Sequence, residues 1–113
     1  MKDGIYHVQF ASALGAAGEG LVVVKDGSVN GGDAGYLYLG RLVGSEGTAL
    51  GGQLHIKRWN PAHVSVFGPI DSFALNVTGQ TSAANDSFTV SGGMPGQPGM
   101  SITIKGRRLA EAA

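Results

Sequence analysis

The sequence predicts an all-β protein in which about eight antiparallel strands close into an up-and-down barrel with little helix. Glycine supplies 20 of the 113 residues, and only 14% of the residues are charged. Short apolar segments alternate with turn residues, and the short connections between them favour antiparallel neighbours. A two-sheet sandwich is the alternative, but the tight turns between successive segments favour a barrel. The length suits one domain, residues 1–113.

Four strands are expected in the first half of the chain, at residues 5–11, 19–25, 28–30 and 35–43. The second and third are separated by Asp26-Gly27, a strong hairpin signal, because a type I′ turn needs positive φ at both central residues. The fourth contains Tyr-Leu-Tyr-Leu at 36–39, which is apolar on both faces. An ordinary half-exposed strand would alternate apolar with polar residues.

Four further strands are expected in the second half, at residues 49–59, 71–79, 86–91 and 100–108. Pro61 follows the first of them and stops it, because proline cannot donate to a strand ladder. Strand 71–79 alternates most clearly, with Phe73, Leu75 and Val77 on one face. Residues 62–70 form either a short helical turn or an irregular crossing segment, and residues 109–113 are expected to fray.

One face of each expected strand points into the barrel. The interior is either a packed core or a cavity for a small apolar ligand, which tyrosine hydroxyls would orient. Composition does not separate these two alternatives. The side chains expected to line such a cavity are Tyr6, Val8, Phe10, Tyr36, Tyr38, Leu54, Phe73, Leu75, Phe88 and Ile102.

Two of the expected strands also carry apolar residues on the outer face. Leu21 and Val23 alternate with the inward valines of their strand and therefore point outward. In segment 36–39 either the two tyrosines or Leu37 and Leu39 must do the same. Soluble monomers usually avoid such a patch, and a self-complementary homodimer would cover it. The alternative is that segment 62–70 covers it.

No group of residues has the pattern of a catalytic or metal site. Serine, histidine and aspartate occur without a Gly-x-Ser-x-Gly elbow, and the three histidines lie in different segments. His7 and His55 are expected on outward faces, where solvation is more common than metal binding. The glycine-rich stretches precede strands and not helices, so turn chemistry explains them better than a phosphate site does. We therefore expect no catalytic residue, metal or cofactor.

Charge and composition also limit the partners. Eight basic residues balance eight acidic ones, so no global field attracts nucleic acid or anionic membranes. Segment 55–60 mixes basic and aromatic residues, but one such patch in a neutral chain is more typical of a strand end than of a nucleic-acid site. Cysteine is absent, which fits a reducing cytoplasm, and no apolar run is long enough for a signal peptide or a membrane span. A cytoplasmic protein is expected.

Asp33 follows the second glycine pair and has two alternative roles. It could cap a turn through its own backbone, or it could fix the entry of the next strand through a buried hydrogen bond.

Five short motifs follow one another along residues 1–60. They are Met-Lys-Asp-Gly-Ile-Tyr at 1–6, Gly18-Glu19-Gly20 before an apolar strand, Gly31-Gly32-Asp33 after a hairpin, a tyrosine-rich strand to Gly40, and Arg58-x-Asn60. In this order and spacing they resemble the GrlR-like family, the negative regulators of type III secretion gene expression.

The resemblance implies a small lipocalin-like β-barrel that forms a cytoplasmic homodimer, has no enzymatic activity and sequesters a transcriptional activator. It also suggests a lipid-like ligand, so that a carrier or sensor of a small apolar molecule is the alternative function. The family has an acidic run after the tyrosine-rich strand that is associated with partner binding. Here Glu46 is the only acidic residue of the corresponding turn. Together with the outward apolar side chains of the two strands, this turn gives the expected partner or dimer surface, which is Leu21, Val23, Leu37, Leu39 and Glu46.

Overall fold

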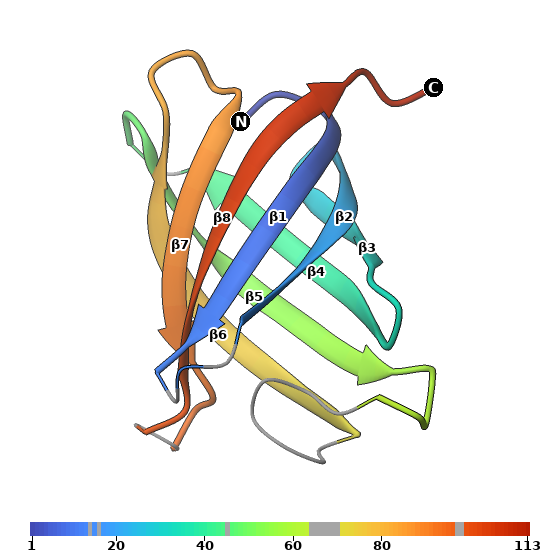
Figure 1. Cartoon of the computed structure of the whole chain (residues 1–113). Helices are drawn as coiled ribbons and strands as arrows, with labels where there is room; N and C mark the ends of the chain where they lie inside the picture. The colour runs from blue at the N-terminus through green and yellow to red at the C-terminus, as the bar shows by residue number, and fades with distance from the viewer. Residues whose placement is uncertain (14, 16, 45, 64–70, 97–98) are drawn as a thin grey trace.

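Eight antiparallel strands form a closed barrel in the computed structural model, which describes residues 1–13, 15, 17–44, 46–63, 71–96 and 99–113 (Figure 1). Each strand pairs with the next in the chain, and the last pairs with the first. The strands are β1 (Gly4–Ser12), β2 (Ala17–Lys25), β3 (Ser28–Gly32), β4 (Tyr36–Gly44), β5 (Ala49–Arg58), β6 (Ser72–Thr81), β7 (Ser87–Gly93) and β8 (Ser101–Ala110). The predicted fold class, an eight-stranded up-and-down barrel, is confirmed.

Helix is absent from the described part of the chain, and accordingly that part offers no helical segment able to span a bilayer. The predicted hairpin between β2 and β3 has Asp26 at φ 51° and Gly27 at φ 83°, so both central residues are in the left-handed region, as predicted. Of segment 62–70, residues 64–70 lie outside the described residues.

Several strands are longer than the sequence predicted. Ala17 pairs with Ala11, so β2 begins two residues before the expected start. The predicted fraying of residues 109–113 is wrong for the first two of them, because Ala110 pairs with Ile5 across the closure between β8 and β1. In a closed barrel the first and last strands pair with each other. Residues at strand ends therefore gain backbone hydrogen-bond partners that the local sequence pattern does not reveal. Only β5 is shorter than expected, since it ends at Arg58.

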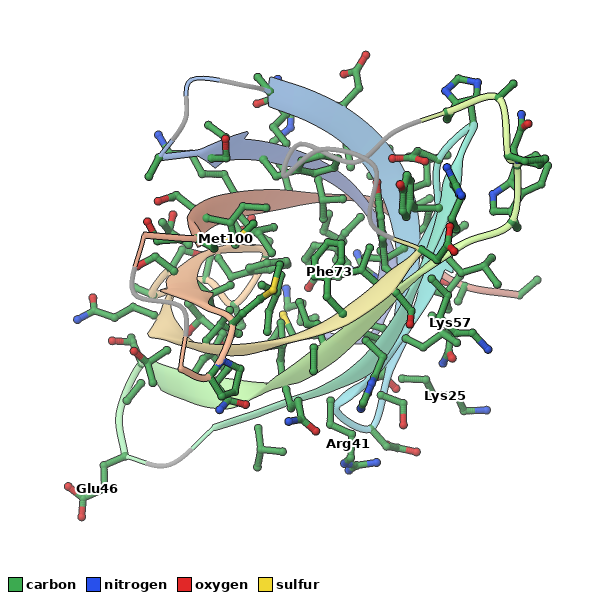
Figure 2. All side chains as sticks on the ribbon, turned by 90° about the horizontal axis from the view of Figure 1, so that it is seen from below. Lys25, Arg41, Glu46, Lys57, Phe73 and Met100 are labelled. Carbon is green, nitrogen blue, oxygen red and sulfur yellow. The ribbon has the colours of Figure 1, made fainter. Side chains whose placement is uncertain are left out.

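The core is formed by side chains from the inward faces of all eight strands. Tyr6, Leu75, Val24 and Val90 are the largest side chains that are almost fully buried. Tyr6 and Phe88 pack with ring centroids 5.7 Å apart, and the Tyr6 hydroxyl donates to the Lys2 carbonyl oxygen over 2.6 Å. These contacts close the end of the barrel at which the chain begins. The view along the barrel axis shows Phe73 pointing into the interior, while Lys25, Arg41, Lys57 and Glu46 point outward (Figure 2).

Every strand also has glycine at an inward position. These residues are Gly4, Gly18, Gly20, Gly31, Gly40, Gly52, Gly79, Gly92 and Gly106. A Cβ on Gly52 would overlap the Arg41 carbonyl oxygen of the neighbouring strand, and one on Gly106 would overlap the Phe88 ring. The missing side chains allow sharply bent strands to approach one another and leave space for aromatic rings.

The close approach at Gly52 leads to a stability test. Gly52→Ala should lower the free energy of unfolding by about 1–3 kcal/mol, because backbone atoms must shift to accept the methyl group. The matched control is Gly51→Ala on the outer face, where a Cβ would lie 3.8 Å from the nearest atom, an ordinary contact. Urea denaturation of both variants measures the difference. Equal stability of the two variants would contradict a close-approach role for Gly52.

Candidate functional site: a cavity at one end of the barrel

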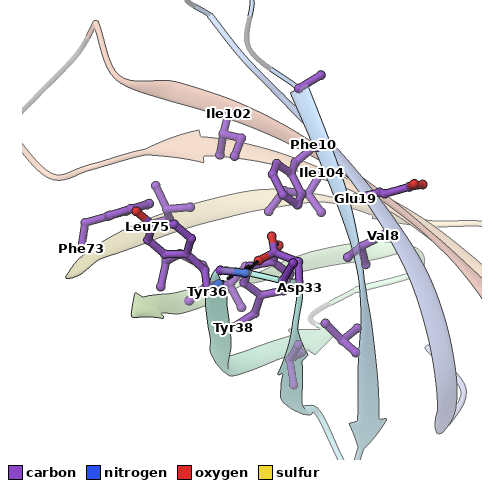
Figure 3. Close-up of a pocket in the computed structure, with 18 of the residues that line it drawn as sticks. Val8, Phe10, Glu19, Asp33, Tyr36, Tyr38, Phe73, Leu75, Ile102 and Ile104 are labelled. Carbon is purple, nitrogen blue, oxygen red and sulfur yellow. Dashed lines mark hydrogen bonds between the residues drawn. The ribbon is translucent and has the colours of Figure 1, made fainter. Parts of the chain in front are cut away.

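A cavity of about 310 Å³ lies inside the barrel at the end where β1, β3, β5 and β7 finish (Figure 3). The barrel strands supply an apolar wall, and the loop between β3 and β4 supplies part of the rim. The wall includes Val8, Phe10, Val22, Val29, Tyr36, Tyr38, Leu42, Leu54, Ile56, Phe73, Leu75, Phe88, Ile102 and Ile104, and the rim includes Asp33, Ala34, Gly35 and His63. Its volume falls at the lower end of the range for small-molecule sites.

The structure places nine of the ten expected cavity residues on this wall. The tenth, Tyr6, is fully buried at the opposite, closed end, where its hydroxyl is held by the Lys2 carbonyl. Tyr36 and Tyr38 are buried, which places the tyrosines inside and Leu37 outside. The sequence interpretation missed Asp33 and His63 at the rim. The signal for Asp33 was its position between a glycine pair and the tyrosine-rich strand.

Asp33 organises the rim through hydrogen bonds. Its Oδ1 accepts from the backbone N–H of Gly35 over 2.8 Å and from that of Tyr36 over 2.7 Å. Its Oδ2 accepts from the hydroxyl of Tyr38, on the wall of the cavity. The two roles considered for Asp33 are therefore combined, since one carboxylate caps the turn and also holds a side chain of the next strand.

The segment after β5 fastens the same loop from outside. The backbone N–H of Trp59 donates to the Gly35 carbonyl over 2.9 Å, and its indole N–H donates to the Asp33 carbonyl over 3.1 Å. Asn60 donates from Nδ2 to the Ala34 carbonyl over 3.1 Å. A Cβ on Gly35 would meet the His63 side chain, so these two residues touch. Segment 55–60 therefore uses its aromatic end to hold the rim of the cavity.

Tyr38 connects the rim to the wall. Its ring meets Phe10 edge-on, with centroids 5.7 Å apart and an interplanar angle of 88°. Burial of the hydroxyl and its hydrogen bond to Asp33 raise the pKa of Tyr38 far above the ordinary value of 10.0. The hydroxyl therefore stays protonated at physiological pH and remains a donor to the carboxylate.

The raised pKa of Tyr38 predicts a loss of stability in alkali. In the unfolded chain this tyrosine ionises near pH 10, whereas in the folded protein it keeps its proton. The unfolded state then binds fewer protons, so the free energy of unfolding falls as the pH rises above about 10. The loss reaches about 1.4 kcal/mol per pH unit for one buried tyrosine. Urea denaturation between about pH 8 and about pH 11.5 should show a steeper decline for the native sequence than for Tyr38→Phe.

Below about pH 10 the two proteins should show the same pH dependence, because neither folded nor unfolded tyrosine is ionised there. Burial also raises the pKa of Tyr6, so part of the alkaline decline should persist in the variant. Superimposable alkaline profiles for the two proteins would contradict the buried, protonated state of Tyr38.

The outer face of β2, β3 and β4 is the second candidate surface. Leu21 and Leu37 flank Gly32 in one row across the three strands, and Val23 and Leu39 flank Asn30 in the next. Leu21 is 51% exposed, Val23 and Leu37 are also exposed, and Leu39 is half-buried. We call these four side chains the outer apolar patch. Gly32 places no side chain between Leu21 and Leu37.

Polar groups border the row of Leu21 and Leu37 on both sides. On β1, His7 pairs across from Leu21 and shares a 2.8 Å contact with the Glu19 carboxylate. On β5, Lys57 pairs across from Leu37. An apolar centre with a polar rim is the usual anatomy of a protein–protein interface. The fifth predicted surface residue, Glu46, is exposed in the turn between β4 and β5, away from the four apolar side chains.

Nothing in the described part of the chain assembles a metal site, since no three histidine or acidic side chains converge there. Its ion pairs are His7–Glu19 and Arg58–Asp71, and both involve exposed acids at the barrel surface. The described residues therefore offer two candidate surfaces, an apolar cavity with a carboxylate at its rim and an outer apolar patch.

An apolar cavity and exposed apolar side chains on the outer face are both features that occur at sites of binding. The model of the family GrlR, described as T3SS negative regulator, matches residues 1–112 of the chain. The protein therefore belongs to the GrlR family of negative regulators of type III secretion. None of the curated proteins with which the sequence was compared matches it.

Proposed function

We propose that this protein represses type III secretion genes by sequestering a transcriptional activator, as a homodimer formed in the cytoplasm and without enzymatic activity. The match to the negative regulators over residues 1–112 carries the proposal. The outer apolar patch supports it, because exposed apolar side chains gathered from β2 and β4 are typical of a protein-binding surface.

The outer apolar patch is the proposed dimer contact. In a two-fold dimer each subunit contributes the same patch, so every patch side chain is buried on both sides of the interface. Full burial of a leucine side chain contributes about 1.5–3 kcal/mol. The patch contributes three leucines and one valine from each subunit. These side chains are already partly buried in the single chain, so each contributes less than the full value, and together they offset part of the entropic cost of association.

Sequestration predicts a stoichiometric effect. In a bacterium that carries a type III secretion system, overproduction of the native chain should lower the expression of a secretion-gene reporter. Overproduction of the activator should restore it, because a sequestering protein is titrated by its target. Repression that persists at any activator level would exclude sequestration.

The double variant Leu21→Ser/Leu37→Ser tests the outer apolar patch. In the same reporter assay it should lose repression, and sedimentation should show a dimer weakened at least about a hundredfold.

The matched control for the outer apolar patch is Val43→Ser. Val43 is 52% exposed on the same strand as Leu37 but lies beyond the patch, toward the turn to β5. This variant should keep both the dimer and repression. If it fails as the leucine variant does, loss of apolar surface in general explains the result and the patch has no specific role.

A second candidate function, the binding of a small apolar molecule, is supported by the cavity itself. Its wall consists mainly of aliphatic and aromatic side chains, and it lies toward one end of the barrel. Such a ligand would gain free energy in proportion to the apolar area that it buries.

Native mass spectrometry of freshly purified protein tests the ligand role. We expect an adduct of lipid-like mass that is lost in Val8→Phe, because the added ring occupies the cavity beside the buried Val8 side chain. Val43→Phe adds the same ring on the outer face and should retain the adduct. A native protein that remains empty after purification, and that takes up no added amphiphile, would rule out this function.

A further inference from the structure

We propose that the cavity selects amphiphiles with a cationic head group, which Asp33 binds at the rim while the apolar tail lies among the wall residues. The inference rests on the proposed ligand role of the cavity and names the chemical class of the ligand. It depends on the charge balance at the rim, the hydrogen bonds of one carboxylate, and the direction in which the cavity changes from polar to apolar.

The carboxylate of Asp33 has no cationic partner in the protein. The described residues include every lysine, arginine and histidine of the chain, and the ion pairs among them involve only Glu19 and Asp71. Arg58 lies at the end of β5, next to the segment that holds the rim. Its guanidinium donates to the Asp71 carboxylate and to the His63 carbonyl oxygen. Lys25, Arg41 and Lys57 point away from the barrel interior (Figure 2). A negative charge therefore lines the cavity without compensation.

Among the described residues, three donors reach this carboxylate, which leaves one acceptor position without a described donor. An ionised carboxylate offers about four lone-pair sites. Oδ1 accepts from two backbone N–H groups, and Oδ2 accepts from the Tyr38 hydroxyl. The remaining site is on Oδ2, the oxygen next to the Tyr38 side chain on the cavity wall. The N–H groups of Gly35 and Tyr36 and the hydroxyl of Tyr38 already donate to Asp33. A ligand that reaches this carboxylate therefore meets a hydrogen-bond acceptor and a negative charge.

The cavity has a polar rim and an apolar interior. Asp33 belongs to the loop at the open end, whereas Val8, Leu54 and Leu75 belong to the buried middle of their strands. The other carboxylate of the rim, Glu19, is directed away from the cavity and contacts His7 (Figure 3). A ligand that fits this polarity has its charged group at the rim and its chain inside. An anionic head group would be repelled by the Asp33 carboxylate, because like charges at short distance repel.

Three probes with the same alkyl chain test the head group: decylamine, decanol and decanoate. Isothermal titration calorimetry at low ionic strength should show that the amine binds about tenfold more tightly than the alcohol, with decanoate weakest. Added salt should reduce the advantage of the amine, because the contact lies at the rim and is partly screened. The emission of Trp59, the only tryptophan, reports occupancy locally, since its indole N–H donates to the Asp33 carbonyl.

The variant Asp33→Asn should bring amine and alcohol within about twofold of each other. Asparagine keeps a side-chain oxygen for the two backbone N–H groups, so the loop can retain its hydrogen bonds. Glu19→Gln is the matched control at the same rim and should leave the preference for the amine unchanged. If Asp33→Asn fails to fold, the order of the three probes and its salt dependence in the native protein still decide the question.

The outcomes separate this inference from the proposed ligand role. Equal binding of the three probes would overturn the cationic selectivity and leave ligand binding intact. An amine preference that survives Asp33→Asn would overturn the assignment to Asp33. Failure of all three probes to bind would overturn both.

Discussion

Closure of the barrel depends on glycine at the inward positions of every strand. Eight short strands can enclose a core only if they bend strongly, and bending brings the backbone of one strand toward that of its neighbour. At Gly52 and Gly79 the space for a Cβ is already occupied by a carbonyl oxygen across the ladder. At Gly106 the space belongs to the Phe88 ring. The glycines that look like turn residues in the composition are therefore largely wall residues of the barrel.

The alternation of strand residues produces the two binding surfaces together. On β4 the buried Tyr38 faces the cavity, whereas the exposed Leu37 belongs to the outer apolar patch. On β2 the buried Val22 lines the cavity, and Leu21 and Val23 face outward. A strand with apolar residues on both faces is uncommon at the surface of a monomer. The proposed function would use these outer residues as a protein-binding surface.

The loop around Asp33 links sequence-distant segments into one rim. Its carboxylate orders the turn and holds Tyr38, and its carbonyl oxygen receives the indole N–H of Trp59. Trp59 ends the expected fifth strand and Asn60 follows it, more than twenty residues later in the chain than Asp33. The rim is therefore built by contacts across the barrel end, and its single uncompensated carboxylate gives an otherwise apolar cavity a defined polarity.

Local patterns were sufficient for the fold class and for most of the wall. The turn at Asp26-Gly27 and the alternation of Phe73, Leu75 and Val77 depend on backbone geometry within a few residues, so the sequence expresses them directly. Nine cavity residues were identified for the same reason. The family was also recognisable from the order of short motifs, and the model match over residues 1–112 extends that recognition to nearly the whole chain.

The tertiary structure decided what local patterns leave open. Whether the tyrosines or the leucines of segment 36–39 face inward depends on the register between β4 and its neighbours, because a shift of one residue exchanges the two faces. Tyr6 belongs to the closed end and not to the cavity because of the position of its hydroxyl near Lys2. The sequence alone thus determined a barrel with two apolar faces, since periodicity is a local property. The cavity, its rim and the charge of Asp33 within it required the folded chain, since they arise where distant segments meet.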